Sequence, residues 1–148
     1  MKVIHATVEH VEVVAPLFDL YRQFYKYAPD LEGARRFIAE RLKNEESVIF
    51  LALDESGEAL GFTQLYPSFS STTMQPLWIL NDLYVRSDCR KSGVASALME
   101  RARKFGIETG AVELMLETAV DNSTAQRLYE KLGWHRDKEF YTYHLFLK

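Results

Sequence analysis

The sequence predicts one α/β domain in which helices flank a mixed β-sheet. Three observations lead to this expectation: the chain has 148 residues, 47% of them are apolar, and segments with helical and strand periodicity alternate along it. A chain of this length can bury most of its apolar surface in a single core. No repeat period or linker divides the sequence, so the expected domain spans residues 1–148.

The first half of the chain is typical of a strand, two helices and a β-hairpin. Thr7 can cap the first helix, in which apolar residues recur at the spacing of one helical face. A turn that contains Gly57 separates the two strands of the hairpin, and a polar loop with an exposed-looking Phe69 follows. The expected elements are a strand at 2–6, a helix from 8 to a break at 28–30, a helix at 31–45, strands at 47–53 and 59–66, and the polar loop at 67–75.

The second half is typical of a βαβ unit followed by a helix and a strand. A long apolar strand leads into a polar turn, and the next helix opens at Gly93 and weakens at Gly106 and Gly110. Gly133 stops the later helix. The expected elements are strands at 77–85 and 112–119, a helix between them, a helix at 123–132 and a final alternating strand at 140–147. The full order is therefore β-α-α-β-β-β-α-β-α-β.

Charge and cysteine content narrow the functional classes. The formal net charge of −3 is too mild for a nucleic-acid-binding protein, which usually carries a basic stripe. Cys89 is the single cysteine, so no internal disulfide can form. No apolar run approaches the ~18 residues of a membrane span, and the first residues lack the apolar centre of a signal peptide. We therefore expect a cytoplasmic protein that binds neither nucleic acid nor a membrane.

Residues 83–95 carry the most chemical information, because a buried strand ends, a polar loop turns and a helix begins there. The first amides of a helix lack internal acceptors, and the helix dipole attracts anions. Gly93 would let the backbone approach a phosphate closely, and Arg90 and Lys91 add positive charge. These features indicate a diphosphate site, and the alternative is a packing glycine beside a solvated turn. Neither the nucleotide P-loop pattern nor the dinucleotide glycine pattern occurs in the sequence.

Two motifs resemble those of the GNAT acetyltransferases. Residues 90–95, Arg-Lys-Ser-Gly-Val-Ala, are similar to the family signature Arg/Gln-x-x-Gly-x-Gly/Ala and follow the expected strand. Residues 121–134 resemble a later motif, with an Asn, an Ala, a Leu-Tyr pair and a Gly before an aromatic residue. The order of elements also fits, so the chain is identified as a member of the GNAT superfamily, similar to its small bacterial enzymes. The resemblance implies a mixed, mostly antiparallel sheet flanked by helices. One departure is Lys91, where many members have glycine.

The resemblance also implies a reaction: acetyl-CoA-dependent transfer of an acetyl group directly to a primary amine, with no metal. Amides across residues 90–95 would hold the coenzyme A diphosphate, and backbone groups of Leu83 and Val85 would pair with the pantetheine arm as an added strand would. Asn122 would meet the pantetheine, cap the helix that follows it, or do both. The residues that the resemblance implies for coenzyme binding are Leu83, Tyr84, Val85, Arg90, Lys91, Ser92, Gly93, Val94, Ala95, Asn122 and Tyr129.

Two residues are the first candidates for proton transfer. Tyr129 resembles the family tyrosine that protonates the leaving thiolate, although a tyrosine on an apolar helical stripe is also common as a core residue. Asp82 lies inside an apolar strand, where a carboxylate is costly unless it is paired or faces a wet cleft. It is the first candidate to accept the proton of the amine, to anchor a cationic amine, or to bind neighbouring backbone. Glu117 is the second candidate for these roles, or lies on a solvated face.

The sequence leaves the acceptor open. A small-molecule amine is the first hypothesis; a protein or peptide lysine or N-terminus, or a non-catalytic acyl-CoA sensor, are the alternatives. Five aromatic residues could line an acceptor pocket or belong to the core: Tyr21, Tyr25, Tyr66, Phe69 and Trp78. The histidines lack metal-ligand spacing, and Cys89 has no histidine partner nearby, so direct attack on the thioester is expected. The tyrosine-rich last strand could pair with a second subunit in a homodimer.

Overall fold

The computed structural model describes all 148 residues and divides into two compact units, Met1–Glu117 and Thr118–Lys148. The first unit contains the whole sheet and three of the four α-helices. The expectation of a single domain over residues 1–148 stays a prediction. No helix in the protein combines the length and apolar character that a membrane span requires.

The sheet of the first unit has five strands in the order of the sequence, β1-β2-β3-β4-β5. Strands β1 (Lys2–His5), β2 (Val48–Leu53), β3 (Ala59–Ser70) and β4 (Gln75–Val85) pair antiparallel with their neighbours. Strand β5 (Leu114–Met115) pairs parallel to β4 through two residues only. The α/β class and the mixed, mostly antiparallel sheet are therefore confirmed.

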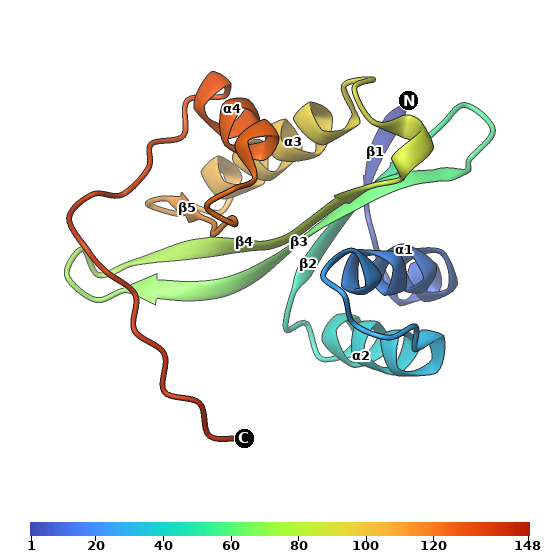
Figure 1. Cartoon of the computed structure of the whole chain (residues 1–148), viewed down its shortest axis with the longest axis horizontal. Coiled ribbons are helices and arrows are strands. Elements are labelled where there is room, and N and C mark those ends of the chain that lie inside the picture. The colour runs from blue at the N-terminus through green and yellow to red at the C-terminus, as the bar shows by residue number, and fades with distance from the viewer. The chain divides into compact units, whose positions relative to one another are not determined.

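Helices α1 (Val11–Phe24) and α2 (Leu31–Lys43) cover one face of this sheet (Figure 1). The short 3₁₀ helix η1 (Val8–His10) precedes α1, and Thr7 caps it as expected. Asp30 caps α2 by accepting from the amide of Gly33. The apolar faces of both helices pack on alternate residues of β2 and β3, and this cluster includes Val14, Leu17, Phe18, Ala34, Ile38, Ile49, Leu51 and Phe62.

Helix α3 (Val94–Glu108) covers the opposite face (Figure 1). The ring of its Phe105 packs edge to face against Phe50, with centroids 5.5 Å apart, and at a tilt against Trp78, with centroids 5.0 Å apart. Trp78 also donates from its indole nitrogen to the hydroxyl of Thr109 at 2.9 Å. The two faces of the sheet therefore carry different cores. Most of the buried polar side chains lie on the α1–α2 face.

Helix α4 (Ser123–Lys131) is the one regular element of the second unit. Asn122 caps it, because its side-chain oxygen accepts from the amide of Ala125 at 3.2 Å. The final strand expected at 140–147 is wrong in this structure, since these residues form no ladder and their apolar side chains are exposed. An alternating pattern favours a strand, but a strand needs a neighbour for its backbone groups, and this unit supplies none.

The remaining differences lie at element ends. The loop expected at 67–75 is mostly strand: β3 continues to Ser70 and β4 starts at Gln75, so only the tip is a turn. Strand β5 is much shorter than the expected 112–119: only Leu114 and Met115 pair with β4 as a ladder, although the amide of Val112 also donates to the carbonyl of Pro76 at 2.8 Å. Phe69 is 80% exposed, as its position suggested.

Candidate active site

The site is built around an irregularity in β4. Gln64 pairs with Asp82 and Leu65 pairs with Leu80, so Asn81 is an extra residue without a partner on β3. Such a bulge bends the strand and changes the direction of nearby side chains. The hydroxyl of Tyr21 on α1 donates to the Asn81 carbonyl at 3.2 Å and ties the helix to the bulge.

Asp82 follows the bulge and is a buried carboxylate that only neutral groups bind. It is 3% exposed, and it accepts from the side-chain amides of Gln64 and of Asn81, the latter at 3.1 Å. Burial raises the pKa of Asp82, and the hydrogen bonds from Gln64, Asn81 and Tyr21 oppose this rise. The hydroxyl of Ser47 donates to Gln64 at 2.8 Å and thereby orients the amide of Gln64 toward Asp82.

An aromatic pocket of about 490 Å³ opens onto Asp82 between α1, α2 and the two central strands. Arg22 and Asn81 also reach its wall. Burial and, to a smaller extent, proximity to Asp82 raise the pKa of Tyr66 to about 12, so its hydroxyl keeps its proton at neutral pH. The aromatic wall residues are Phe18, Tyr21, Tyr25, Tyr27, Phe37 and Tyr66. Tyr21, Tyr25 and Tyr66 are thus pocket residues, as the sequence suggested.

Phe69 and Trp78 do not belong to this pocket, which corrects two of the five aromatic candidates. Trp78 points to the opposite face of the sheet, where it packs on Phe105. Phe69 lies near the exposed tip of the β3–β4 hairpin. The bulge at Asn81 is one reason that spacing alone misplaces side chains here, since the alternation of faces shifts by one residue across it.

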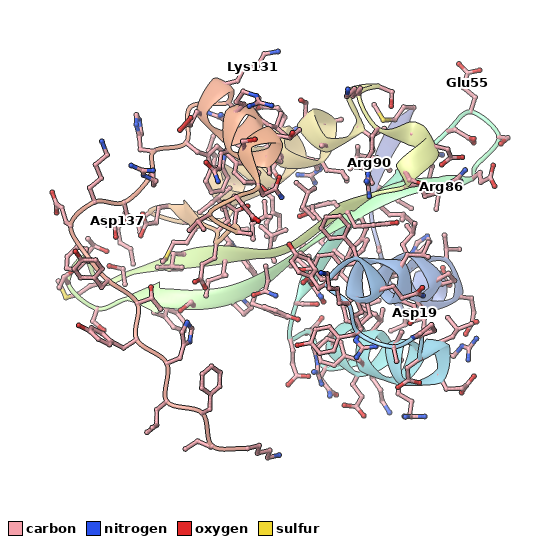
Figure 2. All side chains as sticks on the ribbon, in the orientation of Figure 1. Asp19, Glu55, Arg86, Arg90, Lys131 and Asp137 are labelled. Atoms are coloured by element: carbon pink, nitrogen blue, oxygen red, sulfur yellow. The ribbon has the colours of Figure 1, made fainter.

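A second buried carboxylate, Asp19, braces the segment that closes the pocket. Its two oxygens accept from the amide of Asp30 at 2.9 Å and from the side chain of Gln23 at 3.1 Å. Asp19 lies on α1 (Figure 2), and Asp30 caps α2, so this bond fixes the turn that carries Tyr25 and Tyr27. This role was not predicted, because in the sequence Asp19 looks like an ordinary helix surface residue.

The C-terminal part of β4 has a free edge. Arg86 donates from its amide to the carbonyl of Leu60 at 2.9 Å, which makes this a hydrogen-bonded pair in the antiparallel ladder. Because such pairs alternate with unbonded ones, the backbone groups of Leu83 and Val85 point away from β3, whereas Tyr84 bonds to it. Strand β5 ends its pairing at Ile79 and does not cover this stretch.

The loop after β4 leads into α3 through two left-handed residues. Lys91 has φ 65° and Gly93 has φ 85°. Glycine adopts this conformation without cost, whereas a residue with a Cβ incurs a penalty, which explains why glycine is common at the position of Lys91 in the family. The first backbone bond of α3 runs from Ala97 to Gly93, so the amides of Val94, Ala95 and Ser96 have no acceptor within the helix.

Two arginines, Arg86 and Arg90, hold this loop to the adjacent ends of β3 and β4 (Figure 2). Arg86 binds both oxygens of Asp88, at 3.1 and 2.7 Å, and donates to the carbonyl of Ala59. Arg90 donates to the carbonyl of Val85 at 3.0 Å, and its guanidinium lies 5.6 Å from the rings of both Phe24 and Tyr84. Ser92 donates from its hydroxyl to the carbonyl of Cys89.

Four other candidates, Cys89, Glu117, Tyr129 and Asn122, lie outside the aromatic pocket. Partial desolvation and the neighbouring Asp88 carboxylate raise the pKa of the Cys89 thiol, which disfavours the nucleophilic thiolate. Glu117 is exposed, in line with a solvated face. Tyr129 lies on α4 with its ring 6.3 Å from that of Trp134. Asn122 acts as the helix cap that the sequence offered as one of its roles.

Comparisons with known proteins agree with this fold. The model of the Acetyltransferase (GNAT) family matches residues 14–134. A Bacillus subtilis protein described as the uncharacterized N-acetyltransferase YhfO is 43% identical over 97% of this chain and 95% of its own. A probable acetyltransferase of Haemophilus influenzae is 35% identical over 80% of this chain and 82% of its own. A crystal structure of a probable acetyltransferase, 46% identical, superposes with a TM-score of 0.95 over 100% of this chain and 99% of that one. The chain therefore belongs to the GNAT family and is an N-acetyltransferase.

Proposed function

We propose that this enzyme transfers an acetyl group from acetyl-CoA directly to a primary amine of a small molecule. The observation that carries the proposal is the aromatic pocket with Asp82 in its wall, one residue from the free edge of β4. Concave, mostly apolar pockets of ~300–1,000 Å³ with a few polar groups are typical of small-molecule sites.

Two more distant relatives act on small amines by their descriptions. An aminoglycoside N(6')-acetyltransferase of an Acinetobacter species is 26% identical over 72% of this chain and 76% of its own. A D-amino-acid N-acetyltransferase of Saccharomyces cerevisiae is 34% identical over 62% of this chain and 57% of its own. These relatives support a small acceptor, and they differ too much from each other to name it.

The residues present fit coenzyme A. Amides at the start of α3, with Gly93 and the loop Arg90–Ala95, would hold the diphosphate at the positive end of the helix dipole. Leu83 and Val85 would bind the pantetheine arm through backbone groups, with Tyr84 between them and Asn122 as a further contact. Acetyl-CoA, when bound, supplies the thioester carbonyl that the amine attacks.

Asp82 would accept the proton of the acceptor ammonium, directly or through a water molecule. An alkylammonium has a pKa of ~10.4, so at neutral pH it must lose a proton before it can attack. Burial, which raises the pKa of Asp82, brings this carboxylate closer to the range of an efficient base. We assign protonation of the leaving sulfur to Tyr129, and this role rests on its place in the family motif.

The test is release of free thiol from acetyl-CoA in the presence of polyamines, aminoglycosides, amino acids and lysine peptides. Asp82→Asn should lower kcat by about a hundredfold or more, the usual range for loss of a general base, without weakening acetyl-CoA binding in calorimetry. Tyr129→Phe should lower kcat as well. Glu55→Gln is the control, since Glu55 lies in the β2–β3 turn, away from the pocket (Figure 2).

The outcomes separate the three hypotheses. Turnover of one class of small amine supports the proposal, and turnover of peptides alone would replace it with a peptide acetyltransferase. Binding of acetyl-CoA without turnover of any acceptor, together with no effect of Tyr129→Phe, would favour the acyl-CoA sensor. Failure to bind acetyl-CoA would contradict the assignment of the loop Arg90–Ala95.

A further inference from the structure

The aromatic pocket carries two charges of opposite sign that the protein itself does not neutralise. Asp82 has amide and hydroxyl partners only, and no Lys or Arg forms an ion pair with it. Arg22 lies on α1, in the same wall, and none of the ion pairs of the structure includes it. These are the two charged residues that line the pocket.

The known contacts of Arg22 leave most of its donors free. Its guanidinium lies 5.1 Å from the ring of Tyr27, and one nitrogen donates to the carbonyl of Ala28 at 3.4 Å, a long bond. Arginine has five N–H donors, and a planar guanidinium matches a carboxylate with two parallel bonds. By contrast, Arg41 and Arg35 on α2 each bind two glutamates. Arg22 is therefore the cation available to a ligand in this pocket.

We propose that the acceptor is an amino-carboxylate, an amine of amino-acid type, with its nitrogen at Asp82 and its carboxylate at Arg22. This proposal rests on the function proposed above and specifies the substrate class of the same pocket. A ligand with both charges would neutralise both side chains at once, whereas a polyamine would leave Arg22 facing a like charge.

The aromatic wall restricts the rest of the acceptor. Six rings line the pocket, and the ring pair Tyr21–Tyr25 packs edge to face at 5.1 Å, while Phe18 and Phe37 stack at 5.4 Å. Between the two charged ends the wall therefore offers mainly apolar surface with tyrosine hydroxyls. An acceptor whose side chain is apolar or aromatic would fill this volume better than a highly hydroxylated sugar.

The experiment compares matched acceptors in the acetyl-CoA assay: phenylalanine, its amide and phenethylamine, together with amino acids in which more carbons separate the two charges. The wild-type enzyme should favour a carboxylated acceptor over its counterpart without a carboxylate by about tenfold or more in kcat/KM, as for a charge-assisted hydrogen bond. Arg22→Gln should remove this preference through KM, and Arg22→Lys should restore part of it. Arg36→Gln, an exposed arginine on α2 outside the pocket, is the matched control.

The KM for acetyl-CoA should stay unchanged in Arg22→Gln, and phenethylamine should be turned over at least as well as by the wild type, because the variant no longer sets a positive charge against its ammonium group. These two readouts distinguish loss of recognition from loss of folding. Equal or better turnover by wild type of the amines that lack a carboxylate would overturn this proposal and leave the proposed acetyltransferase intact. Acceptor binding is also measured by calorimetry with coenzyme A present, so the result does not depend on turnover. If no carboxylated amine binds there in an Arg22-dependent way, the amino-carboxylate proposal is wrong.

Discussion

Replacing Asp82 with asparagine should stabilise the protein at neutral pH while it removes activity. The buried carboxylate holds its proton more tightly in the folded chain than in the unfolded one, because burial raises its pKa above the ordinary value of 3.8. In the pH window between 3.8 and the raised value, the folded state binds more protons, so the free energy of unfolding falls as pH rises. The neutral amide of the Asp82→Asn variant would carry no such penalty.

The size of the effect follows from the linkage between protons and folding. Within the window, the stability of Asp82→Asn relative to wild type should grow by up to ~1.4 kcal/mol per pH unit and then stay constant above it. The hydrogen bonds offset little of this gain: the oxygen of the new amide can accept from Gln64, and the exposed Asn81 can rotate to present its own oxygen.

The assay is urea unfolding of both proteins in steps from about pH 4 to pH 8, with equal m-values as the check that the unfolded states match. Glu55→Gln, which changes an exposed carboxylate, is the control and should follow wild type at every pH. Two results would refute the argument that burial dominates the pKa of Asp82. One is that the stabilities of wild type and Asp82→Asn change in parallel with pH, and the other is that wild type gains stability relative to the variant as pH rises.

Two further substitutions test the geometry around β4. Gly61→Ala would place a Cβ 2.5 Å from the carbonyl oxygen of Tyr84, so β3 and β4 must separate by roughly 0.8 Å to reach an ordinary C···O contact. We expect about 1–3 kcal/mol of destabilisation and weaker acetyl-CoA binding, measured by urea unfolding and calorimetry. Gly106→Ala in α3 is the comparison: its Cβ meets only the flexible side chain of Leu114, and helix propensity should make it neutral or stabilising. Phe24→Ala removes one of the two rings beside Arg90 and should weaken acetyl-CoA binding about two- to fivefold, with little loss of stability because Phe24 is 55% exposed. Unchanged affinity would show that Phe24 does not support the loop.

Much of the fold follows from local patterns in the sequence. The helical spacing of Val11, Val14 and Phe18 identifies α1, and the apolar run before Val85 identifies β4. The left-handed Gly93 marks the start of α3, as a glycine before an apolar helical pattern suggests. The strand expected at 140–147 fails because its existence depends on a partner strand, which no local pattern reveals.

The candidate site is predictable only in part. Asp82 stands out in the sequence because a carboxylate in an apolar strand needs an explanation. Its partner Gln64 does not, since a glutamine in a hairpin strand usually faces solvent, and only the register of β3 against β4 places it beside Asp82. Arg22 could not be predicted for a similar reason. Its role depends on which face of α1 lines the pocket, and this follows from the packing of α1 on α2.

The hydrogen-bond chain from Ser47 to Asp82 has a direction. Ser47 gives its hydrogen to the oxygen of Gln64, which leaves the amide hydrogens of Gln64 to face the carboxylate. Asn81 also donates to Asp82 from its side-chain amide, so two neighbouring amides direct their hydrogens, and not their oxygens, at this carboxylate. A proton that Asp82 receives is therefore passed on through the pocket, whose wall also carries the Tyr21 hydroxyl, and not along the chain from Gln64 to Ser47.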